Sequence, residues 1–131
     1  MRVQRQIRLG ESVVVDATPD GSRYGVFFED DGETGYLYGL DHAREEMPIV
    51  DAMMIYQISE SSRGREISLE IVWNASNTGA TLLADGYPQA VFDFDRSQAC
   101  CRSGFPGPIR TGWGVPHEWD NELYWRINPD A

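Results

Sequence analysis

The sequence contains no lysine: its eleven basic residues are all arginines, and they stand against 21 Asp and Glu residues. The formal net charge of the 131-residue chain is therefore −10 at pH 7. Nucleic-acid binding needs a basic patch or stripe on the protein surface, so this charge argues against a nucleic-acid partner. An acidic protein attracts basic molecules by long-range electrostatics. The charge therefore favours a basic protein as the partner.

Long apolar runs are also absent from the sequence. No stretch approaches the about 20 apolar residues of a transmembrane helix, and residues 1–12 lack the apolar core of a signal peptide. We therefore expect no membrane partner and a cytoplasmic location. A hydrophobic content of 41% in a chain of this length predicts one domain, residues 1–131, with its own core.

Cysteine and histidine are scarce. The two cysteines, Cys100 and Cys101, are adjacent, and the ring that would join them is too tight for ordinary disulfide geometry. We expect reduced, buried thiols, with a vicinal redox switch or a thiol–metal site as the alternative. The two histidines are His42 and His117, and no Cys or His pair has zinc-site spacing. We therefore expect no cofactor.

Short alternating segments separated by turn residues dominate the chain. Residues 66–73 are the clearest strand, because Ile67, Leu69, Ile71 and Trp73 alternate with polar or smaller positions. Further strands are expected over residues 12–16, 24–29, 36–40, 49–58, 80–84 and 90–94, with a short buried helix as the alternative for residues 49–58. The sequence predicts a mainly β (α+β) fold, with a single antiparallel sheet or a sandwich of about seven strands.

Two other segments are candidates for helical structure. Residues 41–48 are polar and predict one helical turn, which Pro48 would end. The tail from Pro116 onward predicts a short C-terminal helix, which Trp119 and Leu123 would anchor to the sheet.

One candidate cluster would carry chemistry. Asp93 and Asp95 lie two positions apart on one expected strand, which puts their side chains about 7 Å apart on the same face. This separation suits the paired carboxylates of an inverting glycosidase. Together with His117 and Asp120, they would form the site of a small metal-dependent or acid/base hydrolase-like enzyme. A solvated strand face explains the two aspartates equally well.

An acidic loop and a set of aromatic residues offer a different interpretation. The loop with Asp30, Asp31 and Glu33 lacks EF-hand ligand spacing, so it either keeps a hairpin soluble or binds a basic partner. Aromatic residues and arginines, including Arg110 and Arg126, are interleaved in the second half of the chain, as in interface hot spots, unless the rings only fill the core. The residues of the expected binding face are Asp30, Asp31, Glu33, Tyr87, Asp93, Asp95, Arg102, Phe105, Trp113, His117 and Trp119.

Three segments together resemble a family of small, uncharacterised cytoplasmic proteins from bacteria. They are residues 27–36 (FFEDDGETGY), residues 86–94 (GYPQAVFDF), and residues 101–106 (CRSGFP) with residues 117–119 (HEW). The resemblance extends from about Tyr24 to Trp125 and implies membership of the family without an activity or catalytic residues. Where it leads us to expect Gly-Tyr before Cys101, this chain has Ala99-Cys100, which weakens the vicinal-thiol alternative.

These observations lead to three functional hypotheses. The first is a non-enzymatic interaction protein, in its most concrete form a small acidic immunity or inhibitor protein that covers a basic partner. The second is the Asp/His enzyme described above. The third is a structural or oligomerisation module. No catalytic motif, such as a nucleophile elbow or a phosphate-binding loop, is present in the sequence, which favours the first.

Overall fold

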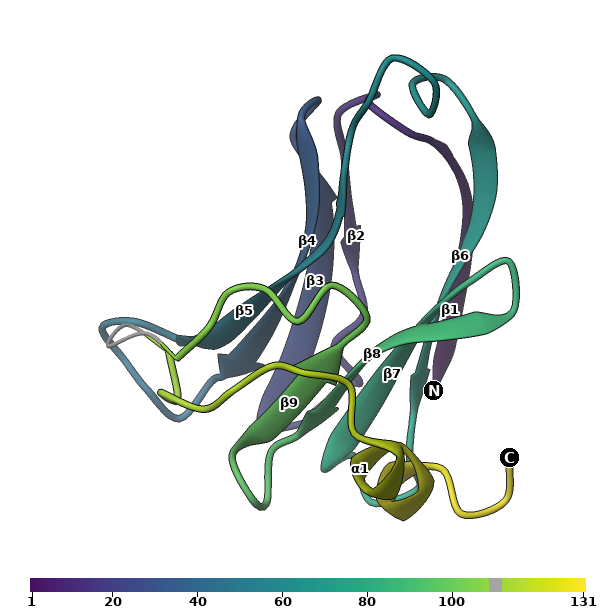
Figure 1. Ribbon diagram of the computed structural model, residues 1–131. Coiled ribbons are helices and arrows are strands. Elements are labelled where there is room, and N and C mark those ends of the chain that lie inside the picture. Colours follow the sequence, from purple (N-terminus) through teal and green to yellow (C-terminus); the bar gives the residue numbers. More distant parts are fainter. Residues whose placement is uncertain (109–111) are drawn as a thin grey trace.

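The computed structural model describes residues 1–108 and 112–131. In these parts of the chain it has nine strands followed by one short helix (Figure 1). The elements are β1 (Arg2–Arg8), β2 (Val13–Asp16), β3 (Tyr24–Asp30), β4 (Thr34–Asp41), β5 (Ile49–Gln57), β6 (Glu66–Trp73), β7 (Gly79–Ala84), β8 (Tyr87–Asp93), β9 (Gln98–Cys101) and α1 (Asn121–Ile127).

The strands form two antiparallel sheets. One sheet has the order β1-β6-β7-β8-β9 and the other the order β2-β3-β4-β5. The mainly β prediction is confirmed, but the alternative of a single sheet and the count of about seven strands are wrong. The sequence analysis missed β1 and β9. Of the seven residues of β1, only Ile7 is buried, and β9 has only four residues, so neither strand shows a clear alternation.

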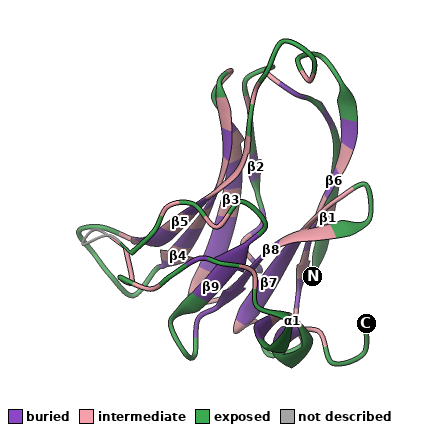
Figure 2. Cartoon of the chain, in the orientation of Figure 1, coloured by how far each residue is buried: buried purple, intermediate pink, exposed green. Residues whose placement is uncertain are grey.

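The core lies between the two sheets. Ile67, Leu69, Ile71 and Trp73 of β6 all face it and are buried, as the alternation predicts. Phe28 of β3 belongs to the same core cluster from the opposite sheet. The Trp73 indole Nε1 donates a hydrogen bond of 2.6 Å to the carbonyl of Ala17, which directly follows β2. Figure 2 shows that buried residues follow the strands, whereas exposed residues gather in the turns and on α1.

The two expected helical segments have different outcomes. Asp41 is the last residue of β4, and residues 42–48 form turns and no helix. The Asp41 side chain accepts hydrogen bonds from Arg23 and from the Ala43 amide, and the Asp41 amide donates one to the Pro48 carbonyl. The C-terminal helix is present, but it begins at Asn121 and not at Pro116. Leu123 is buried beneath it as expected, whereas Trp119 lies before its first turn.

The chain that follows β9 covers the edges of both sheets. The Phe105 carbonyl accepts a hydrogen bond from Met54 of the edge strand β5, at 2.9 Å. The His117 carbonyl accepts one from Cys101 of the edge strand β9, also at 2.9 Å. Exposed strand edges invite unwanted pairing, so this segment protects one side of the sandwich.

Helix α1 has seven residues. Within residues 1–108 and 112–131, no helix has the length and the apolar character that crossing a membrane requires.

Candidate functional site

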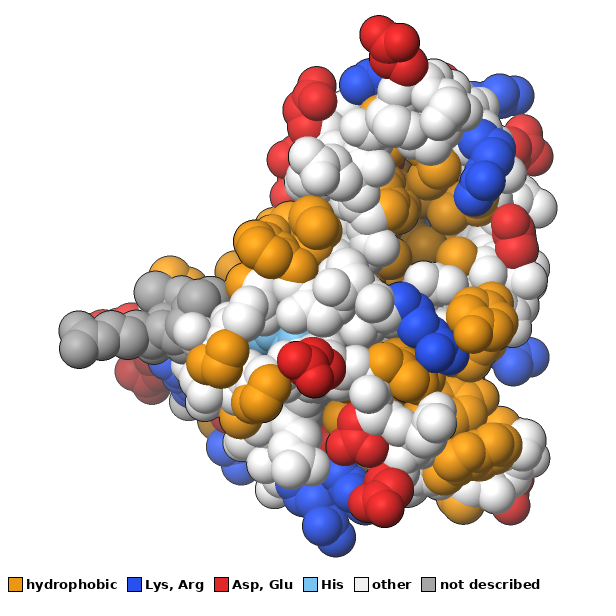
Figure 3. Space-filling view, in the orientation of Figure 1, with side chains coloured by type: hydrophobic (Ala, Val, Ile, Leu, Met, Phe, Trp, Pro, Cys, Tyr) orange, Lys and Arg blue, Asp and Glu red, His pale blue; other side chains and the backbone are white. Residues whose placement is uncertain are grey.

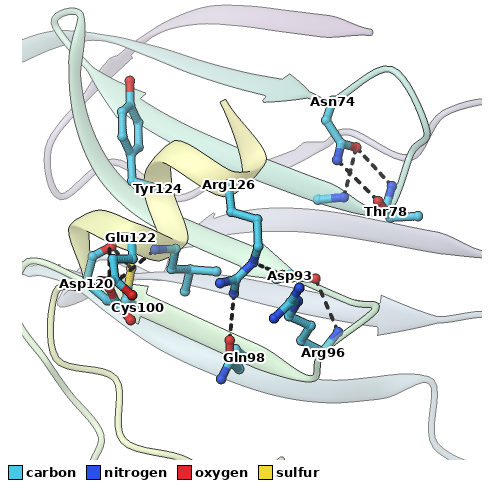
Figure 4. Close-up of polar contacts among 12 residues, drawn as sticks. Asn74, Thr78, Asp93, Arg96, Gln98, Cys100, Asp120, Glu122, Tyr124 and Arg126 are labelled. Atoms are coloured by element: carbon cyan, nitrogen blue, oxygen red, sulfur yellow. Dashed lines mark hydrogen bonds and ion pairs between the residues drawn. The ribbon is translucent and has the colours of Figure 1, made fainter. Parts of the chain in front are cut away.

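The candidate enzyme cluster depends first on Asp93, the last residue of β8. Its side chain is buried and accepts hydrogen bonds from Arg126 Nε at 3.0 Å and from the Arg96 amide at 3.2 Å. The same guanidinium donates to Gln98 Oε1 at 2.7 Å (Figure 4). Asp93 therefore fastens the end of α1 to the β8–β9 hairpin.

The other three members of the cluster have different surroundings. Asp95 is exposed on the β8–β9 turn. Asp120 is the N-cap of α1 and accepts hydrogen bonds from the amides of Glu122 at 2.9 Å and Leu123 at 3.3 Å. His117 is paired with Asp51. The structure therefore does not bring the four side chains together, and the described residues contain no group of three or more metal-ligating side chains.

The Asp51–His117 pair was missed by the sequence analysis. His117 Nε2 lies 2.6 Å from Asp51 Oδ2, and the exposed fraction of each side chain is 1%. Nδ1 of His117 contacts the carbonyl of Pro106. Both ring nitrogens face oxygen atoms, an arrangement that favours the doubly protonated imidazole and its ion pair with Asp51. The only sequence signal is a single acidic residue inside the apolar strand β5.

The surroundings of His117 shift its pKa. Burial alone lowers the pKa of His117, but its hydrogen bonds to Asp51 and to Pro106 raise it, and the net pKa lies above the ordinary value. Asp51 Oδ1 has no hydrogen-bond partner among the described residues, and a Cβ on Gly112 would lie only 2.3 Å from it. The Asp51–His117 contact joins the segment after β9 to β5.

The acidic loop is largely occupied by its own turn. Asp30 is buried and accepts hydrogen bonds from Gly10, Gly32 and the Tyr56 hydroxyl, at 2.8, 2.8 and 2.6 Å. Asp31 accepts from the amides of Glu33 and Thr34, both at 2.9 Å, and these bonds lower its pKa. Glu33 is exposed. The first two carboxylates close the β3–β4 hairpin.

The aromatic residues divide between core and surface. The partly buried Trp113 ring packs edge-on against Phe92 and Phe94 of the core, with centroids 5.8 and 5.7 Å apart. Phe105 is exposed beside β5. Arg110, another residue of the interleaved set, lies outside the described residues.

Tyr87, Arg102 and Trp119 meet on the surface. The Arg102 guanidinium lies over both rings, 4.6 Å from the centroid of Tyr87 and 3.6 Å from that of Trp119. Its Nε also donates a hydrogen bond of 3.0 Å to the Pro88 carbonyl. Cation–π contacts of this kind contribute about 0.5–1 kcal/mol each at exposed sites. The sequence composition identified these residue types, and the return of the chain over β8 brings them together.

This aromatic cluster continues onto α1. Tyr124 lies 5.9 Å from Trp119 and 5.1 Å from Trp125, measured between ring centroids, and Trp125 is 51% exposed. We call Tyr87, Arg102, Trp119, Tyr124 and Trp125 the Trp/Tyr/Arg surface. Figure 3 shows hydrophobic side chains gathered near α1 and at the β7–β8 hairpin, with an arginine between them.

A groove of about 570 Å³ adjoins this surface. Its walls are the start of β9, the segment of Val115 and Pro116, and the turn that leads into α1, with Trp119 shared between groove and surface. Glu118 and Glu122 also line it. Sequence analysis gave no signal for this groove, because it arises where a loop and a helix meet a strand edge.

A second aromatic group lies on the outer side of the four-stranded sheet. Phe27 and Tyr38 are cross-strand partners with centroids 4.5 Å apart, and Tyr36 lies 5.9 Å from Tyr38. The rings are nearly parallel, at interplanar angles of 17° and 29°, so each ring stacks on its neighbour and part of its face is covered. All three are half-buried, and the alternation of β3 and β4 is the signal that places them opposite the core.

Residues 7–128 match a family described as uncharacterized proteins conserved in bacteria (DUF2251). The chain belongs to this family. A Haemophilus influenzae relative, named an uncharacterized protein, is 45% identical over 86 residues. The aligned part is 65% of this chain and 53% of the relative, so the match spans about half of the relative's length. No solved structure matches the chain.

Family membership confirms the resemblance expected from residues 27–36, 86–94, 101–106 and 117–119. The matched range includes the Trp/Tyr/Arg surface, the groove and the Asp51–His117 pair. Neither the family description nor the name of the relative assigns an activity. The function is therefore argued from the geometry.

Proposed function

We propose that this member of the family is a non-enzymatic interaction protein that binds a basic protein partner through the Trp/Tyr/Arg surface. The observation that carries the proposal is the stack of Arg102 between Tyr87 and Trp119. Trp, Tyr and Arg dominate the hot spots of protein interfaces. Because the Arg102 guanidinium already packs on both rings in the free protein, we expect binding to lose little side-chain entropy there.

The net charge supports a basic partner. With 21 acidic and 11 basic residues, the chain attracts cationic proteins over long distances at low ionic strength. Glu118 and Glu122 border the surface, are exposed, and make no ion pair among the described residues. Charge then governs the encounter, and the aromatic residues govern how long the complex lasts. An immunity or inhibitor protein that covers a basic partner is the most concrete form of this function.

The hydrolase alternative gains no support from the geometry. It required Asp93, Asp95, His117 and Asp120 to share one pocket. Instead, Asp93 bonds to Arg126, His117 bonds to Asp51, Asp120 caps α1 and Asp95 is exposed.

Affinity capture from the source bacterium tests the proposal. The tagged chain should recover a basic protein at about 50 mM salt, where the Debye length exceeds 10 Å, and much less of it at about 1 M salt. The double variant Tyr87→Ala/Trp119→Ala should lose the captured protein. Val14→Ala/Met47→Ala shortens two exposed apolar side chains outside the Trp/Tyr/Arg surface and should retain it. Recovery of no basic protein, or equal recovery by the double variant, would contradict the proposal.

A further inference from the structure

The edge of β9 has an unused hydrogen-bonding position that opens into the groove. Amide groups alternate sides along a strand. The Arg102 amide bonds to Gln89 of the β8 side, and the Cys101 amide points the other way, to His117. Two residues earlier, the Ala99 amide therefore also points away from β8. No described residue accepts a hydrogen bond from it, and Ala99, of which only 3% is exposed, lines the inner wall of the groove.

The groove is short along the strand. His117 occupies the edge at Cys101, and the turn before Gln98 ends the strand at the other side. One carbonyl of an added segment can therefore accept a single main-chain hydrogen bond from the Ala99 amide. This is the smallest form of strand addition, in which main-chain bonds align a peptide and side-chain contacts select it.

The side chains around the groove select for positive charge. Glu118 and Glu122 project from its rim without ion-pair partners among the described residues. Asp120 adds a third carboxylate, although its oxygen is used in the helix cap. Arg126 lies at the Gln98 end, but its guanidinium is engaged with Asp93 and Gln98. In Figure 3, acidic side chains run down this face beside α1.

Apolar groups complete the groove. Val115, Pro116, Trp119 and Leu123 contribute to its walls. Lysine and arginine have long aliphatic stems that pack on apolar surface while the charged end stays in water. The groove therefore offers an edge for the backbone, apolar walls for the stems and carboxylates for the charges of a basic segment.

We infer that the groove binds an extended basic segment of the protein partner, which adds to the edge of β9 at Ala99. The inference rests on the proposed function, because it specifies how the basic partner engages the region around Trp119. A second copy of this chain does not fit, since it carries the same net charge of −10.

Nuclear magnetic resonance of the full chain, labelled with ¹⁵N, tests this inference. The probe is a blocked hexapeptide of alternating Lys and Val, and its Glu/Val counterpart is the reference. The Lys/Val peptide should shift the Ala99 amide resonance and slow its hydrogen exchange about tenfold or more, because that amide becomes a donor. The Glu/Val peptide should do neither.

Charge-matched variants separate the groove from the overall charge. Glu118→Gln/Glu122→Gln should weaken binding of the Lys/Val peptide about three- to tenfold at low salt, a range expected for partly exposed ion pairs. Glu45→Gln/Glu46→Gln makes the same change in net charge on the exposed turn after β4, and should alter the affinity less than about twofold.

The outcomes distinguish the two proposals. If the Lys/Val peptide fails to bind, binds without affecting Ala99, or binds equally to both Gln variants, the groove inference is wrong. The interaction function then still stands if the affinity capture recovers a basic protein. If that capture fails, the proposed function is wrong, whatever the peptide does.

Discussion

At the scale of single residues, the proton on His117 is linked to folding. Its pKa is raised in the folded state, so the folded protein retains a proton that the unfolded chain releases above about pH 6.5. This contribution to stability is complete below the unfolded-state pKa, and it is lost as the pH rises through the folded-state pKa. We expect the free energy of unfolding to fall with pH across this window, as measured by urea denaturation at closely spaced pH values.

A pair of histidine variants isolates this effect. His117→Gln should flatten the pH dependence above about pH 6.5, and it should also destabilise the fold because Asp51 is left buried without its partner. His42→Gln removes an exposed histidine and should retain the slope of the unmodified protein. An unchanged slope in His117→Gln would show that another group is responsible.

The two thiols give a second prediction at this scale. Cys100 and Cys101 are free and buried, as expected from the sequence, and burial raises the pKa of Cys100 to about 11. The thiolate is the reactive form of cysteine. We expect a thiol-specific chromogenic reagent at pH 8 to leave both cysteines of the folded protein unmodified and to react with both in urea. Rapid reaction of the folded protein would contradict the burial of these thiols.

At the scale of elements, α1 depends on Asp120. The Asp120 carboxylate accepts hydrogen bonds from two amides of the first turn, and replacing such a cap by alanine typically costs about 1 kcal/mol. Asp120→Ala should lower the free energy of unfolding by that amount in urea denaturation. Asp120→Ser keeps a capping oxygen and should recover most of the loss. Equal stability of the two variants would show that the cap contributes little.

The strands also show where the sequence pattern alone is enough to identify an element. The alternation of Ile67, Leu69, Ile71 and Trp73 identifies β6 with its observed bounds, because one of its faces is buried along its whole length. β1 escapes the same reasoning, since an edge strand with mostly exposed arginines and glutamines has no apolar face to read. It is recognised only through its pairing with β6.

The candidate site was predictable in composition but not in arrangement. Tyr87, Arg102 and Trp119 were selected as residue types common in interfaces, but their stacking depends on where the segment after β9 lies. The Asp51–His117 pair joins residues 66 positions apart, and no local pattern encodes such a contact. The groove likewise combines β9, a loop and α1. Sequence reasoning fails at these sites because each depends on tertiary contacts between distant segments.

At the scale of the whole molecule, net charge and aromatic surface act together. The Trp/Tyr/Arg surface would favour self-association by hydrophobic contact. The charge of −10 opposes it, because two copies repel each other at low ionic strength. A basic partner would be attracted both by the negative net charge and by hydrophobic contact with the exposed rings. We therefore expect a heterotypic complex and not a homodimer.

The oligomeric state follows from this balance. We expect a monomer of 14.8 kDa by light scattering in about 20 mM salt, where the Debye length exceeds 20 Å and repulsion is strong. Screening at about 0.5 M salt should leave the mass unchanged, because Arg102 already covers part of the exposed rings of Tyr87 and Trp119. A stable dimer at low salt would mean that hydrophobic contact outweighs charge repulsion. The Trp/Tyr/Arg surface would then be a candidate self-association face, and the oligomerisation hypothesis would replace the interaction proposal.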